Sequence, residues 1–280
     1  MDGLSEIVPI KELPRENGKV ALFTATGGTL LDGTAPARFE FSPVPVMTAE
    51  AVGAPALGLL RLNGEEIPPA QMGRFAGGRL AANFQIRDLD GPGAQASLDA
   101  AARDIHDRFA AGPDPTLPPG APGLFTDPGG AATAVPGLAQ RLTVNAAADP
   151  AAGGALWRVR DGLQASAPGP VGNADLLLGM HEALGALRPS SLAGMSPVPR
   201  SAATLAADLS SWAASGRIEA ERVLGGATAQ SATFEAMRQQ DGVDSDREME
   251  TLLALERAYA SNAKVLQAVD EMLQTMLRLT

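Results

Sequence analysis

The C-terminal end of the chain carries the most regular hydrophobic pattern. Apolar positions recur there at alternating steps of three and four residues, which places them on one face of a helix. The residues of this heptad seam are Leu252, Leu255, Tyr259, Asn262, Leu266, Val269, Leu273 and Met276. We predict an amphipathic helix over residues 241–280, in which Asn262 costs stability but fixes the register of the packing.

A second apolar row makes this face wider than a two-stranded coiled coil needs. It repeats every seven residues and consists of Ala258, Val265, Met272 and Leu279. A single chain has little apolar surface left with which to cover such a face. We therefore expect the heptad seam to be an assembly interface, buried against neighbouring subunits or against an N-terminal helix that precedes this sequence.

The first 75 residues show the short alternating runs and turn signals of β-strands. Strands are predicted at residues 19–24, 29–31, 38–41 and 57–62, and the third is expected to be half-buried. Gly27-Gly28 supplies a hairpin turn between the first two strands, and Asn63-Gly64 closes the last one. Residues 1–6 are expected to be the end of a helix that Pro9 stops. Residues 1–75 are thus predicted to form a β-rich outer module.

The middle of the chain, residues 76–240, changes to helical spacing. A helix is predicted over residues 78–111, and Gly91-Pro92-Gly93 is expected to bend or break it. Residues 112–170 are predicted to be an insertion that holds a Pro- and Gly-rich loop and a strand at 141–144. Further helices are predicted at 174–187 and from an N-cap at Ser201 to about Met237.

These segments predict an α+β fold. Long helices form a coiled-coil-like bundle, and a small antiparallel β module lies near the N-terminus. Hydrophobic residues make up 45% of the chain but aromatic residues only 4%, so its core relies on small and aliphatic side chains. Such a core favours close-packed helices over a large ligand cavity.

Charge and composition exclude several classes of function. A formal net charge of −10 argues against a nucleic-acid partner, because neutralising phosphates requires a basic surface. The absence of cysteine removes disulfides, thiolate nucleophiles and cysteine-ligated zinc. No run approaches the ~18 apolar residues of a membrane span, and the N-terminus lacks a signal-peptide pattern. The acidic polar face of the C-terminal helix also disfavours binding to a membrane surface.

One segment suggests a function of a different class. Thr26-Gly27-Gly28-Thr29 follows an apolar strand and resembles the nucleophile loop of bacterial asparaginases. The alternative is therefore an amidohydrolase that uses Thr26 or Thr29. That chemistry also needs a second loop with Thr, Asp and a lysine, whereas Thr126-Asp127 is followed by Pro128 and by no suitable lysine. A Gly-Gly hairpin turn is the simpler interpretation.

The remaining titratable residues form no recognisable site. His106 and His181 are the only histidines, and neither has a second histidine one helical turn away, so packing or surface roles are expected. The sequence also lacks the spacings of phosphate-binding and calcium-binding loops. We therefore predict a chain that is not an enzyme, with no catalytic residue, no cofactor and no metal.

The C-terminal pattern also resembles a known signature. The residues that carry it are Gly242-Val243-Asp244, Glu248-Met249, Leu252, Ala258-Tyr259, Asn262-Ala263-Lys264-Val265-Leu266 and Val269-Asp270-Glu271-Met272-Leu273. They resemble the C-terminal signature that flagellar rod, hook and hook-associated proteins share, the axial family of the bacterial flagellum. Glu256-Arg257 departs from the family, which usually has glutamine there, but this pair lies off the heptad seam.

Other segments are similar to one branch of that family, the FlgK hook-associated proteins. They are Met1-Asp2-Gly3-Leu4-Ser5, Gly77-Gly78-Arg79-Leu80 with Ile86-Arg87-Asp88, and the run from Gly153 to Gly162. This resemblance implies a structural subunit at the junction between hook and filament. A hook or rod subunit is the alternative, and a strand in place of the helix over 78–111 would favour it.

The resemblance further implies partners and location. The partners would be neighbouring axial subunits, namely the hook protein, the second junction protein and further copies of the chain, with an export chaperone before assembly. The protein would be secreted through the flagellar type III apparatus without a cleaved signal peptide and would lie outside the cell. The family's N-terminal helix is absent, so we expect a truncated chain.

Overall fold

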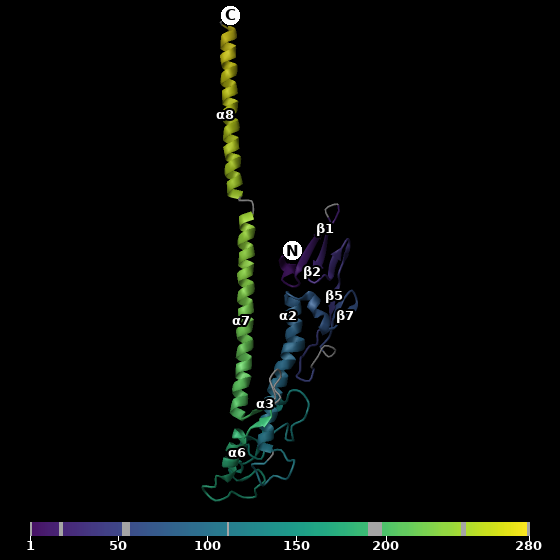
Figure 1. Ribbon diagram of the computed structural model, residues 1–280, viewed down its shortest axis with the longest axis vertical. Coiled ribbons are helices and arrows are strands. Elements are labelled where there is room, and N and C mark those ends of the chain that lie inside the picture. Colours follow the sequence, from purple (N-terminus) through teal and green to yellow (C-terminus); the bar gives the residue numbers. More distant parts are fainter. Residues whose placement is uncertain are drawn as a thin grey trace. The chain divides into compact units, whose positions relative to one another are not determined.

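The structure is a computed structural model that describes residues 2–16, 19–51, 57–110, 112–189, 198–241 and 245–278 (Figure 1). The chain divides into a first unit, Met1–Trp212, and a second unit, Ala213–Thr280. The first unit combines small antiparallel sheets with helices, and the second is helical. The predicted α+β class is therefore confirmed.

Two small sheets build the N-terminal part of the first unit. The first has the order β1-β2-β3-β4, with β1 at Ile10–Pro14, β2 at Val20–Thr24, β3 at Thr29–Asp32 and β4 at Ala35–Pro36. The second has the order β5-β6-β7, with β5 at Phe39–Phe41, β6 at Leu60–Leu62 and β7 at Glu65–Ile67. Every pairing is antiparallel between strands that follow one another in the chain, so each sheet is a meander.

The predicted turns shape these sheets. Gly27 has a φ of 93° in the β2–β3 turn, and Asn63 and Gly64 have φ values of 54° and 85° between β6 and β7. Positive φ at both central residues gives a turn whose twist matches that of the flanking strands. The strand at Ile10–Pro14 was not predicted, and it pairs with β2 along its whole length. Its sequence, Ile-Lys-Glu-Leu-Pro, is too polar for the alternation to stand out.

The prediction of a half-buried third strand is only partly right. Phe39 and Phe41 of β5 keep 39% and 45% of their surface exposed. Each ring still packs edge to face on another ring, at a centroid distance of 5.7 Å for Phe39 and Phe75 and 5.6 Å for Phe41 and Phe84. The strand thus lies on the rim of the core rather than across it.

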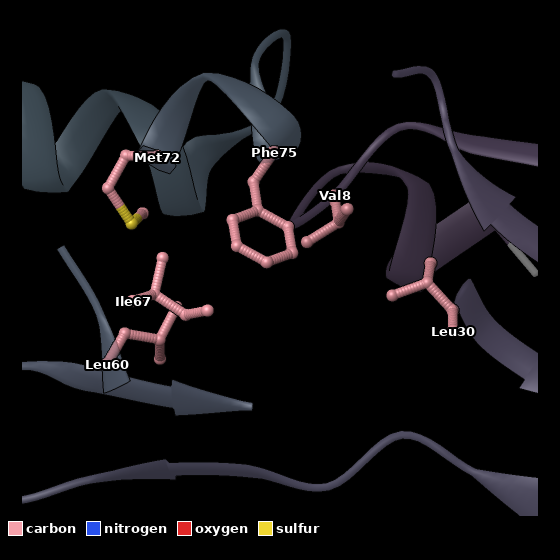
Figure 2. Packing of buried hydrophobic residues seen from close by; sticks show 6 residues of the cluster. All are labelled: Val8, Leu30, Leu60, Ile67, Met72 and Phe75. Carbon is pink, nitrogen blue, oxygen red and sulfur yellow. The ribbon is translucent and has the colours of Figure 1, made fainter. Parts of the chain in front are cut away.

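The core of the β module forms around Phe75, at the end of the 3-10 helix η2 (Pro69–Phe75). Figure 2 shows this ring between Val8 on one side and Met72 above the β6 and β7 side chains on the other. The buried members of the cluster are Val8, Leu30, Leu60, Ile67, Met72 and Phe75. They come from both sheets and from η2, so one hydrophobic cluster joins the two sheets.

The same module is attached to the long helix that follows. The backbone N–H groups of Arg79 and Leu80, at the start of α2 (Arg79–Gln85), donate to the carbonyls of Glu6 and Ile7. The first N–H groups of a helix have no partner within it, so these carbonyls serve as its cap. The close approach requires glycine at position 78, because an added Cβ would overlap the carbonyl of Ile7. The short helix α1 (Asp2–Ser5) precedes this contact.

The helix predicted over 78–111 is present but is not broken at Pro92. It runs through α2, a π-helical turn labelled η3 (Ile86–Asp90) and α3 (Gly91–Ala110). Within the turn, the N–H of Gly91 donates to the carbonyl of Ile86, five residues earlier. Proline normally clashes with the carbonyl four residues before it. A wider turn at that place relieves the clash, so the chain stays helical.

The insertion after α3 is largely irregular, as predicted. Its elements are β8 (Phe125–Thr126), α4 (Leu138–Arg141), β9 (Thr143–Val144), η4 (Pro150–Ala152) and α5 (Arg158–Asp161). The predicted strand at 141–144 is shorter than expected, because Arg141 ends a helical turn and only Thr143–Val144 pairs with β8. The helix α6 (Asp175–Gly185) and the pair β10 (Arg188–Pro189) and β11 (Pro199–Arg200) follow.

Two long helices end the chain. In α7 (Ala202–Asp241) the N–H of Thr204 donates to the hydroxyl of Ser201 at 3.2 Å, which confirms the predicted N-cap. The helix continues through Gly225-Gly226 and beyond the predicted end near Met237. The last helix, α8, spans Ser245–Arg278. Residues 242–244, between these two helices, lie outside the described part of the chain.

Among the described residues, no helix is both long enough and apolar enough to cross a bilayer.

Replacing Gly78 tests the attachment of the β module. We expect Gly78→Ala to lower the free energy of unfolding by about 1–3 kcal/mol, because its Cβ meets backbone that cannot swing away. Gly93→Ala in α3 is the matched control, since a Cβ there meets no atom within 4 Å. The control is expected to be neutral or stabilising by up to about 1 kcal/mol. Equal midpoints of urea unfolding for the two variants would contradict the assignment.

Candidate assembly interface

The heptad seam lies on α8 and is exposed wherever the structure describes it. Leu252, Leu255 and Tyr259 keep 62%, 57% and 74% of their surface exposed, and Asn262 is exposed as well. The other seam side chains, of Leu266, Val269, Leu273 and Met276, lie outside the described part of the structure. The described half of the seam is therefore an apolar surface that this chain leaves open to water.

Two residues of the neighbouring row are described, and the other two, Met272 and Leu279, lie outside the described part of the structure. Val265 is largely exposed, and Ala258 beside it is exposed too. Met249 and Leu253 add further exposed apolar area on the same helix. Large contiguous apolar surface is uncommon on isolated soluble proteins and marks places where another protein packs.

A second apolar row, which was not predicted from the sequence, runs along α7. Trp212, Val223 and Phe234 are spaced eleven residues apart, which is three helical turns, so they lie on one face. Met237 continues this face, and all four residues are exposed. Glu219 and Gln230 interrupt the row, which hides it from a search for heptads. An eleven-residue spacing was the signal that could have revealed it.

Four charged side chains of α7 form two ion pairs within the helix. Arg217 lies 2.5 Å from Glu221, and Arg222 lies 2.6 Å from Glu219. The hydrogen bond from Arg222 lowers the pKa of Glu219. Exposed pairs of this kind contribute little to stability. Burial against a partner would therefore stabilise the apolar row of α7 more than it would stabilise these charged pairs.

The threonine loop suggested as a nucleophile is a hairpin turn between β2 and β3. The hydroxyl of Thr26 donates to the carbonyl of Arg74 at 2.5 Å, and the N–H of Gly28 donates to the hydroxyl of Thr24 at 2.8 Å. Thr29 is exposed at the start of β3. The first contact holds the hairpin on the η2 helix and the second closes its turn, so Thr26 and Thr24 have structural roles.

The second threonine loop, at Thr126-Asp127, is also held by local contacts. Asp127 accepts hydrogen bonds from Arg141 Nε at 2.9 Å and from the hydroxyl of Thr133 at 2.7 Å. Thr126 faces the hydroxyl of Thr143 across the β8–β9 pair. The hydrogen bonds from Arg141 and Thr133 hold the pKa of Asp127 far below its ordinary value. This carboxylate therefore fastens the loop between β8 and α4.

His106 is buried and contacts the same loop between β8 and α4. Its Nδ1 lies 2.8 Å from a carboxylate oxygen of Asp107, and its Nε2 accepts a hydrogen bond from the N–H of Ala132 at 3.2 Å. His181 is exposed on α6. Within the described ranges, no group of three or more histidine, aspartate or glutamate residues gathers as a metal ion would require.

Comparison with known proteins gives one match, in the C-terminal region. Residues 239–279 match the family model described as the C-terminal region of the flagellar basal body rod FlgEFG proteins. No curated protein and no solved structure matches the chain. The matched range contains the whole of α8 and the whole heptad seam.

The family match gives the exposed seam a context. It supports a place among the flagellar axial proteins and a structural role there. It likewise supports a location in the flagellum and contact with other axial subunits. It points to a structural protein rather than an enzyme, and it does not select one member of the axial family.

The network around Asp127 makes a prediction about pH. Its pKa is lower in the folded state than the ~3.9 of an unfolded chain, so its contribution to stability is complete above about pH 4. That contribution is lost as the pH falls from about 4 towards the folded pKa. We expect Asp127→Asn to be less stable than the parent at pH 6 and to lose less stability between pH 4 and pH 2.

Urea unfolding of both proteins across this pH range makes the measurement. Glu65→Gln in β7 is the control, because its exposed carboxylate takes no part in the network. The control should keep the parent's dependence on pH. Parallel pH curves for the parent and Asp127→Asn would show that the network does not stabilise the fold.

Proposed function

We propose that this protein is a structural subunit of the bacterial flagellum, at the junction between hook and filament, and that it assembles through the heptad seam of α8. The observation that carries the proposal is the coincidence of two facts in one segment. Residues 239–279 match the axial family model, and the described seam residues in that segment are exposed. The mechanism is burial of helices between subunits, with no chemical turnover.

The energetics favour assembly. Fully burying a leucine or a residue of similar size stabilises by about 1.5–3 kcal/mol. The seam offers Leu252, Leu255 and Tyr259 in succession, and the sequence continues the pattern through Leu266 to Met276. A single helix cannot cover its own face, so this free energy is available only to a partner. Asn262 would then set the register of the partner helix.

The helical middle of the chain supports the junction subunit over a hook or rod subunit. Hook and rod proteins are expected to be richer in β-structure between their termini, whereas residues 79–110 here are helical. The hook or rod alternative keeps one argument in its favour, since the matched family model takes its description from such proteins. The alternative from another class of function is an amidohydrolase that uses Thr26 or Thr29. Release of ammonia from asparagine, and loss of that activity in Thr29→Ala, would support it.

Partners and route follow from the same proposal. The seam would contact the hook protein, the second junction protein and further copies of this chain, with an export chaperone before assembly. Export would use the flagellar type III apparatus without a cleaved signal, so the assembled protein would lie outside the cell.

A charge on the seam tests the proposal. We expect Leu255→Asp or Leu266→Asp, introduced into the chromosomal gene, to abolish filaments while hooks still form. An aspartate buried in an apolar interface without a partner costs several kcal/mol, which is enough to prevent assembly. Electron microscopy of the cells, together with detection of the exported variant in the medium, gives the readout.

The matched control is Ala260→Asp, which adds the same charge at an exposed position of α8 that faces away from both the heptad seam and the neighbouring row. Control cells should carry normal filaments. Normal filaments in the Leu255→Asp and Leu266→Asp cells would refute the assembly interface. Loss of hooks together with filaments would instead identify a hook or rod subunit.

A further inference from the structure

An arginine of α3 is completely buried beside the start of α7. The side chain of Arg108 has no exposed surface, and that of its partner Asp104 is only 7% exposed. Arg108 Nε donates to Asp104 at 2.6 Å, one turn back on the same helix. A buried arginine requires a partner for its charge and for its remaining N–H groups. The partners of those groups lie on two other segments of the first unit.

The first of these segments is the C-terminal end of α6. Arg108 Nη1 donates to the carbonyls of Ala183 and Ala186, each at 2.7 Å. The last carbonyls of a helix have no partner inside it and form the negative end of the helix dipole. A guanidinium at this place satisfies these carbonyls and complements the dipole. Arg108 thus caps α6 from the side of α3.

The second segment is the start of α7, where β11 leads into the first turns of the helix; we call it the α7 root. Arg108 Nη2 donates to the carbonyl of Arg200 in β11 at 2.9 Å. The side chain of Arg200 in turn donates from Nε to Asp208, two turns into α7, at 2.5 Å. A polar connection therefore runs from Asp104 through Arg108 and Arg200 to Asp208. It links α3, the end of α6 and the first turns of α7 within the first unit.

We propose that Arg108 is a clamp that fixes the first turns of α7 against α3 and the end of α6 within the first unit. Arginine suits this task because its donors form a rigid, planar fork, whereas lysine offers a mobile point charge. The clamp needs no partner protein, so it holds whether or not the proposed function is correct. Among the described residues of α7, Leu205 is the only one that is fully buried, so the hydrogen bond from Arg108 adds a second fixed point to the α7 root.

Spin labels on the full chain measure the orientation directly. The sequence has no cysteine, so Ala96→Cys in α3 and Ser211→Cys in α7 provide the only thiols. Both positions are exposed and both lie in the first unit. In the otherwise unchanged chain we expect a single narrow distribution of label distances. With Arg108→Met or Arg108→Lys we expect the distribution to broaden clearly or to split.

Hydrogen exchange supplies an independent readout. The backbone N–H groups of residues 205–209 should exchange roughly tenfold faster in Arg108→Lys, the factor that loss of about one charge-assisted hydrogen bond brings. Exchange in residues 98–103 of α3 should not change. Arg103→Met is the matched control, because Arg103 donates to the carbonyls of Ala132 and Thr133 and not to the α7 root.

Two outcomes would overturn the clamp. One is an unchanged distance distribution in folded Arg108→Lys, and the other is equal broadening in Arg103→Met. If the Arg108 variants do not fold, Asp208→Asn replaces them, since it removes the partly exposed end of the connection and leaves the buried pair intact. Broadening in Asp208→Asn supports the proposal, and an unchanged distribution there contradicts it.

Discussion

Apolar side chains along one face of a helix need a surface to pack on, because no helix can cover its own face. On α8 that requirement is unmet wherever the structure describes the side chains, since the seam from Leu252 to Asn262 is open to water. The row on α7 that passes through Val223 and Phe234 is open in the same way. Both rows belong largely to the second unit, in which none of the described side chains is buried.

The first unit meets the same requirement within itself. Its two N-terminal sheets share one cluster around Phe75 with residues of η2 and α2. A second, smaller cluster forms where Phe109 of α3 meets Leu176 and Met180 of α6. These two cores lie at the two ends of the helix that runs from Arg79 to Ala110.

Polar contacts fix the loops of the first unit that lie outside these two cores. Phe125 and Trp157 are the only aromatic residues in the insertion over 112–170, so it has few large side chains with which to pack. Its loops are instead tied to helices by charged groups, such as Asp99, which accepts from the N–H groups of Gly137 and Ala139. Asp127 and Arg108 act in the same way on neighbouring segments. An aspartate that accepts backbone N–H groups orders a loop without requiring a hydrophobic core beneath it.

The amino-acid sequence by itself determined the elements whose cause is local. Heptad spacing gave α8, Ser201 gave the start of α7, and Gly27-Gly28 and Asn63-Gly64 gave the turns of the two sheets. Each depends on side-chain periodicity or on the φ angles open to a residue, and both are properties of short segments. The seam residues of the candidate interface were identified on the same basis.

Tertiary structure alone decided the features that depend on distant partners. It paired the polar strand Ile10–Pro14 with β2. It also buried Arg108 between α6 and β11, about which the spacing of Asp104 and Arg108 says nothing. A strand without alternation gains its hydrogen bonds only from a neighbour, and a buried charge is tolerated only where carbonyls from other segments converge. Those groups are brought together by the fold, so no short stretch of sequence contains them.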